Sequence, residues 1–265
     1  MMELTAKEQK AREMVCLPLD GLKSLGEIQA RVEELSPVVG LFKIGKETFT
    51  RFGPPAVKLV QQYRANVFLD LKYHDIPKTV EGAADAATQL GVYMFNVHAS
   101  GGKAMLEAAV QGAAKSLFHY DKPMPKIVGV TVLTSIDEDI LNNQLRVPGT
   151  VEEQVLNLAQ LCQGAGLDGI VCSAADLGFL KGKLPPDFMK VTPGVEGPRT
   201  KAHGSDQKRV ATPGYTVQNG SSILVVGRAI TDPRTKEQKD AGLVVTPDMR
   251  VQAGYEILQD MAPYL

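Results

Sequence analysis

The chain contains eight short runs of apolar and β-branched residues, spread from one end to the other. Most of these runs are continuous rather than alternating in polarity, which is typical of strands buried on both faces of a parallel sheet. The predicted strands are Met14–Asp20, Val39–Gly45, Asn66–Lys72, Tyr93–Ala99, Lys126–Leu133, Gly169–Ser173, Phe188–Gly194 and Ile223–Arg228. The sequence therefore predicts an α/β protein with a parallel sheet.

Between the predicted strands lie segments with apolar residues three and four positions apart, the spacing of an amphipathic helix. The predicted helices are Leu22–Leu35, Pro55–Arg64, Pro77–Leu90, Gly102–Ser116, Val151–Ala165 and Pro247–Met261. Strand and helix alternate through 265 residues, close to the roughly 250 residues typical of a TIM barrel. We predict one (β/α)8 TIM barrel domain over residues 1–265, with an open doubly wound sheet as the alternative fold.

The longest predicted loop, Val195–Arg209, lies between the seventh and eighth predicted strands. It contains Gly197, Pro198 and Gly204 together with several basic residues. Barrels commonly place phosphate-binding elements in this region. We interpret the loop as a mobile lid.

Charge and cysteine content exclude several classes of protein. The 29 basic and 30 acidic residues give a formal net charge of −1, so no overall field attracts a nucleic acid. The three cysteines, Cys16, Cys162 and Cys172, are odd in number and widely spaced, which favours neither a disulfide framework nor a zinc site. We therefore expect no bound metal and no nucleic-acid partner.

The N-terminal segment Met1–Arg12 is polar and charged, and it lacks the apolar stretch of a secretory signal. Apolar residues nowhere run for the about 18 positions that a membrane-spanning helix needs. We therefore expect a cytoplasmic protein that does not enter the membrane.

Polar residues follow the apolar runs at the ends where a barrel carries its chemistry. These residues are Asp20, Lys43, Asp70, Lys72, His98, Thr134 and Arg228. Because the C-terminal ends of all strands of a parallel barrel meet at one mouth, we expect these side chains to gather there.

Asp70 and Lys72 are two positions apart on a predicted strand, so both side chains point to the same side of the sheet. Lys43 on the neighbouring strand can reach the same region, which gives the alternation of cation and anion that buried charges require. A simple ion pair at the end of a strand is the alternative for Asp70 and Lys72, and a partly buried structural ring is the alternative for His98.

Two further candidates lie at predicted helix starts. Asp75 precedes Pro77 by two residues, so capping of the helix is the alternative to a functional role. Gly227 and Arg228 end the last predicted strand, where backbone N–H groups and a guanidinium can meet a dianionic phosphate. A surface arginine after a turn is the alternative there.

The segment Asp70–Thr79 reads D-x-K-x-x-D-I-P-x-T and closely resembles the signature of the orotidine 5′-phosphate decarboxylase family. Shorter matches extend over nearly the whole chain. They are Leu19-Asp20, Phe42-Lys43-Ile44-Gly45, Val97-His98-Ala99, Thr131 to Ser135, Asp168 to Ser173, Val191-Thr192-Pro193-Gly194, Asp206 to Arg209 and Val226-Gly227-Arg228. The fold implied by the resemblance is again a (β/α)8 barrel.

The resemblance implies conversion of orotidine 5′-monophosphate to uridine 5′-monophosphate and CO2 without a cofactor. Lys72 would stabilise the C6 carbanion and protonate it, within a charge network of Asp70, Lys72 and Asp75. It also implies a homodimer in which Asp75 and Thr79 reach across the interface into the other barrel.

The remaining roles implied by the resemblance concern the binding of the nucleotide. Asp20 and Lys43 would bind the ribose hydroxyls, with Lys43 also bonding Asp70, while Thr134 and Pro193 would border the pyrimidine. Gln207, Gly227 and Arg228 would hold the phosphate. His98, at the end of its strand, is a further candidate for substrate binding.

The sequence departs from the family pattern in three places, one of which is a longer or less familiar N-terminal segment. Arg234–Val245 looks longer or less familiar than the compact family core, and Val195 and Glu196 stand where many bacterial relatives carry a basic residue. Two other functions stay open: a Mg2+-dependent sugar-phosphate decarboxylase or aldolase of the same superfamily, and a non-catalytic barrel that binds a phosphorylated ligand.

Overall fold

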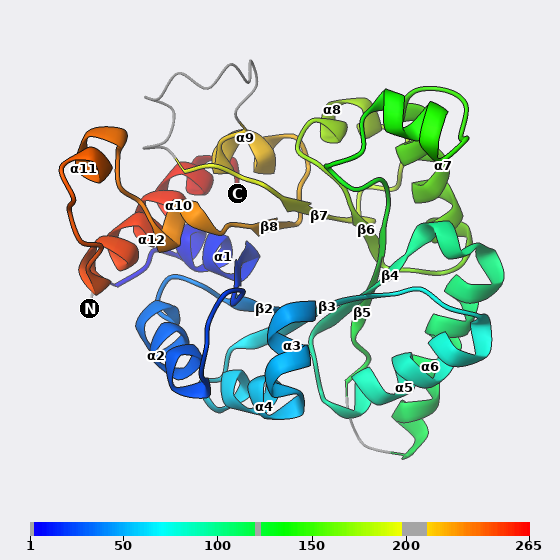
Figure 1. The fold of residues 1–265 in the computed structure, drawn as a ribbon, viewed down its shortest axis with the longest axis horizontal. Helices are drawn as coiled ribbons and strands as arrows, with labels where there is room; N and C mark the ends of the chain where they lie inside the picture. The colour runs from blue at the N-terminus through cyan, green and yellow to red at the C-terminus, as the bar shows by residue number, and fades with distance from the viewer. Residues whose placement is uncertain (1–2, 120–122, 198–210) are drawn as a thin grey trace. The chain divides into compact units, whose positions relative to one another are not determined.

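The computed structural model describes residues 3–119, 123–197 and 211–265. Its eight strands form a closed barrel in which each strand lies next to the following one and β8 pairs with β1 (Figure 1). The pairings along the chain are parallel. The predicted (β/α)8 barrel is confirmed, and the open doubly wound sheet is wrong.

Each predicted strand corresponds to one strand of the structure. The strands are β1 (Val15–Pro18), β2 (Leu41–Gly45), β3 (Asn66–Tyr73), β4 (Met94–His98), β5 (Lys126–Val130), β6 (Gly169–Val171), β7 (Met189–Pro193) and β8 (Ile223–Val225). Several end earlier than predicted because apolar residues continue into the following loop. Leu133, for example, was expected in the fifth strand, but it lies beyond β5 and is 38% exposed.

Helices alternate with the strands along the chain. They are α1 (Ala6–Met14), α2 (Leu25–Leu35), α3 (Lys46–Phe52), α4 (Pro54–Gln62), α5 (Pro77–Gln89), α6 (Lys103–His119), α7 (Val151–Gly164), α8 (Asp176–Leu180), α9 (Pro213–Gln218), α10 (Arg228–Thr231), α11 (Lys236–Asp240) and α12 (Pro247–Met261). The six predicted helices are present as α2, α4, α5, α6, α7 and α12.

The structure adds two early helices that the sequence analysis did not predict. Helix α1 begins with a capping box in which the Thr5 hydroxyl accepts from the Glu8 N–H and the Glu8 carboxylate accepts from the Thr5 N–H. Helix α3 follows β2 directly and ends at Gly53, whose φ of 59° is left-handed. Pro54 then starts α4, a position that suits its fixed backbone angle.

The chain divides into two compact units, of which the first comprises Met1–Val67 and Thr192–Leu265. Within this unit, β1 pairs with β2 on one side and with β8 on the other. The C-terminal helix α12 contacts α2. There the guanidinium of Arg250 donates to both carboxylate oxygens of Glu34, at 2.6 and 2.8 Å. Both side chains are 14% exposed, so this ion pair is largely shielded from water.

The second unit, Phe68–Val191, contains β4, β5 and β6 with most of β3 and β7. Helices α5 and α6 lie side by side in it (Figure 1). Gly112 allows this packing, because a Cβ there would collide with the backbone of Glu81. The prediction of a single domain over residues 1–265 stays a prediction.

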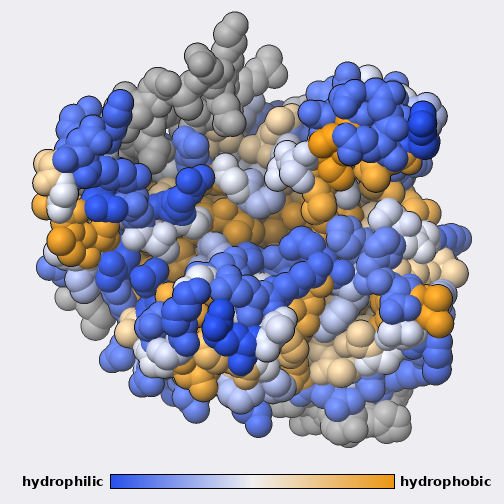
Figure 2. Space-filling model, in the orientation of Figure 1, coloured by the Kyte–Doolittle hydropathy of each residue, from blue (hydrophilic) through white to orange (hydrophobic). Residues whose placement is uncertain are grey.

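The surface near α11 combines hydrophilic side chains with an apolar patch (Figure 2). The exposed apolar residues of this segment are Leu243 at 42% and Val244 at 76%. They belong to the stretch Arg234–Val245 that the sequence analysis found unfamiliar. Across the residues that the structure describes, no helix is long and apolar enough to cross a bilayer.

The shielded ion pair between Arg250 and Glu34 generates a stability prediction. Arg250→Met leaves the Glu34 carboxylate largely buried without its bidentate partner, so the free energy of unfolding should fall by roughly 2–4 kcal/mol. Urea denaturation, followed by circular dichroism, measures this change.

A matched control comes from an exposed pair in the same unit. Arg51 lies 3.5 Å from Glu47 on α3, and both side chains are more than 40% exposed. Arg51→Met should change the free energy of unfolding by less than about 0.5 kcal/mol. If the free energy of unfolding falls equally in the two variants, burial does not make the Arg250–Glu34 pair more stabilising than an exposed pair.

Candidate active site

The core of the candidate site is an ion pair at the end of β3. The Lys72 ammonium donates to Oδ1 of Asp70 at 2.5 Å. Asp70 is 7% exposed, so its carboxylate is largely removed from water. The predicted pairing of these two residues is confirmed, and it places a cation next to a buried anion at the C-terminal end of a barrel strand.

Asn96 of β4 completes this cluster, and the sequence analysis missed it. Its side-chain amide donates to the same Oδ1 of Asp70 at 2.7 Å, and its carbonyl oxygen accepts from the backbone N–H of Lys72 at 2.8 Å. Asn96 is 1% exposed. The signal that was available is a polar residue inside an otherwise apolar strand, because such a residue needs hydrogen-bond partners when buried.

Lys72 also has an unusual backbone. Its φ of 52° lies in the left-handed region, which residues with a Cβ rarely adopt. Such strain costs of order 1–3 kcal/mol and persists only where the surroundings fix it. The sequence analysis treated Asp70 and Lys72 as neighbours on a regular strand, so this local geometry was not predicted.

His98, the last residue of β4, lies next to His74. The ring centroids are 5.3 Å apart and the planes are tilted by 41°. Gly101 lies close to His74 and Met105. A Cβ at this position would lie 3.2 Å from the His74 ring and would collide with the Met105 side chain. His74 was not among the predicted site residues, and the structure places its ring beside that of His98.

A second ion pair lies in the first unit, at the ends of β1 and β2. The Lys43 ammonium donates to Oδ2 of Asp20 at 2.9 Å. The Lys43 side chain is 12% exposed and that of Asp20 is 45% exposed. A Cβ at Gly45 would lie 2.6 Å from Asp20 Oδ1 and 2.9 Å from Lys43 Nζ. Glycine is therefore required at position 45 because any side chain would collide with the ion pair. Its backbone φ of −83° is one that other residues also adopt.

The loop that carries Asp20 is fixed by backbone hydrogen bonds. The Leu19 N–H donates to the Lys43 carbonyl oxygen at 3.0 Å. The buried hydroxyl of Thr48, on α3, donates to the Leu19 carbonyl oxygen at 3.0 Å. The unpredicted helix α3 thus positions the first carboxylate of the site.

Arg228 and Gly227 line a cavity of about 470 Å³. The cavity lies after β7 and β8, and its other lining residues are Pro18, Gly194, Val195, Glu196, Val225, Ala229, Asp232 and Lys239. Arg228 is the first residue of α10 rather than the last residue of β8, so the predicted strand was too long. The predicted association of Gly227 and Arg228 at a helix start is confirmed.

Asp232, on the wall of this cavity, is already neutralised by neighbouring cations. Arg234 donates to its two carboxylate oxygens at 2.7 and 3.0 Å, and the Lys239 ammonium lies 3.6 Å from it. The hydrogen bond from Arg234 lowers the pKa of Asp232. Among the described residues, by contrast, no ion pair joins Arg228 to an acidic side chain.

The start of α5 is exposed, and the alternative role of Asp75 as a cap is wrong. The N-cap residue is Ile76, and no side chain caps the helix. The Asp75 carboxylate instead accepts from the adjacent Ile76 N–H at 2.6 Å. Asp75 and Thr79 are exposed, and Ile76 is 66% exposed. These side chains are therefore accessible from outside their own chain.

Two of the remaining candidate residues are described by the structure, and the third lies outside the described residues. Thr134 lies in an exposed turn, four residues beyond the end of β5, because β5 is shorter than predicted. Pro193 is the last residue of β7 and is half-buried. Gln207 and most of the predicted lid lie outside the described residues.

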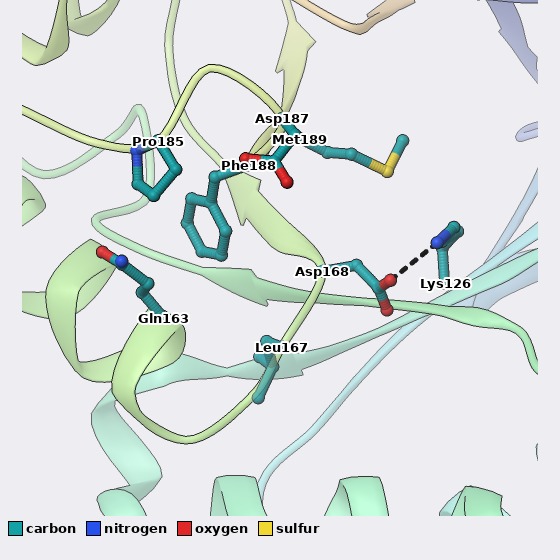
Figure 3. Close-up of a pocket in the computed structure, with 8 residues that line it drawn as sticks. All are labelled: Lys126, Gln163, Leu167, Asp168, Pro185, Asp187, Phe188 and Met189. Atoms are coloured by element: carbon teal, nitrogen blue, oxygen red, sulfur yellow. Dashed lines mark hydrogen bonds and ion pairs between the residues drawn. The ribbon is translucent and has the colours of Figure 1, made fainter. Parts of the chain in front are cut away.

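A second cavity lies at the opposite ends of the strands. Figure 3 shows its lining, which includes Lys126 at the start of β5 and Asp168 and Phe188 just before β6 and β7. Lys126 donates to Asp168 at 2.8 Å, which raises the pKa of Lys126. Asp168 also accepts from the Ile127 N–H at 2.9 Å. Because these contacts join the N-terminal ends of strands, we assign them to stability rather than chemistry.

Residues 13–241 match the protein family described as "Orotidine 5'-phosphate decarboxylase / HUMPS family". The chain is 44% identical to the orotidine 5′-phosphate decarboxylase of Syntrophus aciditrophicus (strain SB) over 229 residues, covering 86% of this chain and 90% of that protein. It is 45% identical to the protein of the same name from Moorella thermoacetica over 221 residues, covering 83% and 86%.

The chain is also similar to solved structures in both sequence and fold. The crystal structure of orotidine 5′-phosphate decarboxylase from Lactobacillus acidophilus is 33% identical with a TM-score of 0.76, covering 93% of this chain and 98% of that one. An uncharacterised conserved protein from Geobacillus kaustophilus is 32% identical with a TM-score of 0.70, covering 91% and 99%.

Proposed function

Because the chain belongs to the Orotidine 5′-phosphate decarboxylase / HUMPS family, we propose that it converts orotidine 5′-monophosphate to uridine 5′-monophosphate and CO2. This reaction is the last step of the de novo synthesis of uridylate. The structural observation that carries the proposal is the shielded ion pair between Lys72 and Asp70, 2.5 Å apart. The identity to named decarboxylases over most of their length supports it.

The reaction requires a cation at the carbon that loses CO2. Departure of CO2 from C6 leaves an electron pair in an orbital orthogonal to the ring π system, so the ring cannot delocalise it. A fixed ammonium can stabilise this charge by electrostatic preorganisation. We assign this role to Lys72, which then donates its proton to C6. The catalytic step therefore uses a side chain of the protein in place of a cofactor.

Asp70 has two proposed tasks. It fixes the Lys72 ammonium through their hydrogen bond, and it lies beside the carboxylate of the bound substrate. Repulsion between these two carboxylates is relieved as neutral CO2 leaves. Asp75 of the partner subunit completes the proposed charge network.

We propose that the ion pair of Asp20 and Lys43 binds the ribose hydroxyls. A carboxylate accepts hydrogen bonds from hydroxyl groups and an ammonium donates to them. The 45% exposure of Asp20 leaves it accessible to a ligand. A Cβ at position 45 would collide with both side chains of this pair. The absence of a side chain at Gly45 therefore supports this assignment, because it leaves space for the pair.

The cavity at Arg228 is the proposed phosphate site. Its guanidinium can donate two parallel hydrogen bonds to a phosphate, and Gly227 lets the backbone come close. Gln207 is assigned to the same phosphate by resemblance. Thr134 and Pro193 are proposed to border the pyrimidine, and His98 to contact the substrate.

We also propose that the enzyme is a homodimer in which Asp75 and Thr79 complete the site of the partner subunit. The support is the exposure of both residues together with the 66% exposure of Ile76 between them. This exposure leaves the three side chains accessible to a partner subunit, and the resemblance of Asp70–Thr79 to the family signature implies the contact itself. A cytoplasmic location accords with three buried cysteines that form no disulfide.

The first prediction about function concerns the reaction and its dependence on Lys72. The purified protein should decarboxylate orotidylate, as measured by the fall in pyrimidine absorbance, and activity should persist after exhaustive chelation. Lys72→Ala should lower kcat by about 1,000-fold or more, because the preorganised cation is lost. Lys58→Ala, an exposed lysine on α4, is the control that should keep full activity.

Two outcomes would redirect the assignment. Loss of activity on chelation, with recovery on adding Mg2+, would favour the sugar-phosphate decarboxylase or aldolase. Binding of uridylate without any release of CO2 from orotidylate would favour a non-catalytic binding barrel.

The second prediction concerns the phosphate site. Arg228→Ala should lower kcat/KM for orotidylate by about 10- to 100-fold, because a charge-assisted contact to the phosphate is lost. Added phosphite should accelerate the turnover of orotidine, which lacks the phosphate, and Arg228→Ala should lose most of this acceleration. Steady-state kinetics with both substrates measures the two effects. An unchanged kcat/KM for orotidylate in Arg228→Ala would refute the assignment.

The third prediction tests the contribution across the dimer interface. Lys72→Ala and Asp75→Asn should each be nearly inactive alone. After unfolding together and refolding, an equal mixture should recover about a quarter of wild-type activity, because half of the dimers are hybrids with one intact site. A mixture as inactive as its two components would show that both residues act within one chain.

A further inference from the structure

Strand β3 carries an irregularity at the residues proposed for catalysis. Leu69 pairs with Phe95 of β4, and Tyr73 pairs with Val97. Three residues of β3, Asp70 to Lys72, therefore lie opposite a single residue of β4, which is Asn96. Such a bulge interrupts the backbone hydrogen bonds of the sheet and redirects the side chains that it carries.

The side chain of Asn96 supplies contacts across this bulge. Its carbonyl oxygen accepts from the Lys72 N–H at 2.8 Å, at the residue whose φ is 52°. Its amide nitrogen donates to Asp70 at 2.7 Å. One side chain therefore contacts the strained backbone of Lys72 and the carboxylate that binds the Lys72 ammonium.

The chemistry of the two neighbours fixes the orientation of the Asn96 amide. A backbone N–H can only donate, so the atom facing Lys72 must be the oxygen. An ionised carboxylate can only accept, so the atom facing Asp70 must be the NH2 group. Reversal of the amide would break both hydrogen bonds. At 1% exposure of Asn96 and 7% exposure of Asp70, water has little access to replace them.

We propose that Asn96 is a positioning residue for decarboxylation. This inference rests on the proposed function of Lys72. Asn96 holds the Lys72 backbone in its left-handed conformation and holds Asp70 in the orientation that receives the ammonium. The direction of the ammonium is thereby set by a residue that does not touch the substrate.

Asn96→Asp is the sharpest test, because aspartate has nearly the same size and can still accept from the Lys72 N–H. It replaces the donor to Asp70 with an oxygen that repels it. We expect kcat to fall by about 100-fold, the cost of misplacing a catalytic group by about 1 Å. The dissociation constant for uridylate should stay within about threefold, since phosphate and ribose contacts are untouched.

A double-mutant cycle separates positioning from a general role in folding. If Asn96 acts through Lys72, adding Asn96→Ala to Lys72→Ala should lower kcat by less than about twofold further. If Asn96 has a purely structural role, Asn96→Ala should lower kcat by a similar factor in the wild-type protein and in Lys72→Ala. Additive effects would therefore overturn the proposal.

Ser116→Ala is the matched control for the loss of a buried hydrogen bond to a carboxylate. Ser116 is fully buried on α6, and its hydroxyl donates to Oδ1 of Asp85 at 2.5 Å. This variant should keep the wild-type kcat. A fall in kcat equal to that of Asn96→Asp would overturn the proposal, because any buried polar loss would then have the same effect.

The crystal structure of Asn96→Ala provides a readout that does not depend on activity. We expect the φ of Lys72 to leave the left-handed region and the distance between its ammonium and Asp70 to increase. An unchanged Lys72 backbone would overturn the proposal. If the wild-type protein fails to decarboxylate orotidylate, the proposed function falls, whereas this structural result still decides whether Asn96 positions Lys72.

Discussion

The buried carboxylate of Asp70 is the constraint on which the candidate catalytic cluster depends. An ionised carboxylate that is 7% exposed is costly unless cations and hydrogen-bond donors surround it. One of its oxygens accepts from both the Lys72 ammonium and the Asn96 amide. A lysine has a flexible four-carbon stem, and the buried anion restricts where its charge can lie. The need to satisfy Asp70 therefore restricts the position of the ammonium to which we assign the catalytic role.

The sequence predicted the barrel well because its strands are buried on both faces and form continuous apolar runs. It also predicted that Asp70 and Lys72 would meet, but on the assumption of a regular strand. The structure brings them together on a bulge, with Lys72 in a left-handed conformation. Neither residue type signals such a bulge, because the conformation depends on Asn96 in another strand. Local patterns cannot reveal a geometry that is set by a long-range contact.

Strand ends were the least predictable feature, and several candidate residues depend on them. The predicted fifth strand extended to Leu133, which put Thr134 at its end, whereas β5 ends at Val130. The predicted eighth strand included Arg228, which instead begins α10. Apolar composition does not distinguish the last buried residue of a strand from an exposed residue of the following loop. The alternative role of Asp75 as a helix cap is wrong because its carboxylate accepts from the adjacent N–H of Ile76, which is itself the N-cap residue.

The charges around the Arg228 cavity, which is the proposed phosphate site, depend partly on the stretch Arg234–Val245. Glu196 lies on the cavity wall, and its carboxylate makes the cavity less positive. The unfamiliar stretch offsets this, because Arg234 binds Asp232 with both of its carboxylate oxygens. Asp232 therefore does not draw the Arg228 guanidinium away from a ligand. The same stretch brings Lys239 to the cavity wall. The stretch Arg234–Val245 thus contributes to the electrostatics of the proposed phosphate site.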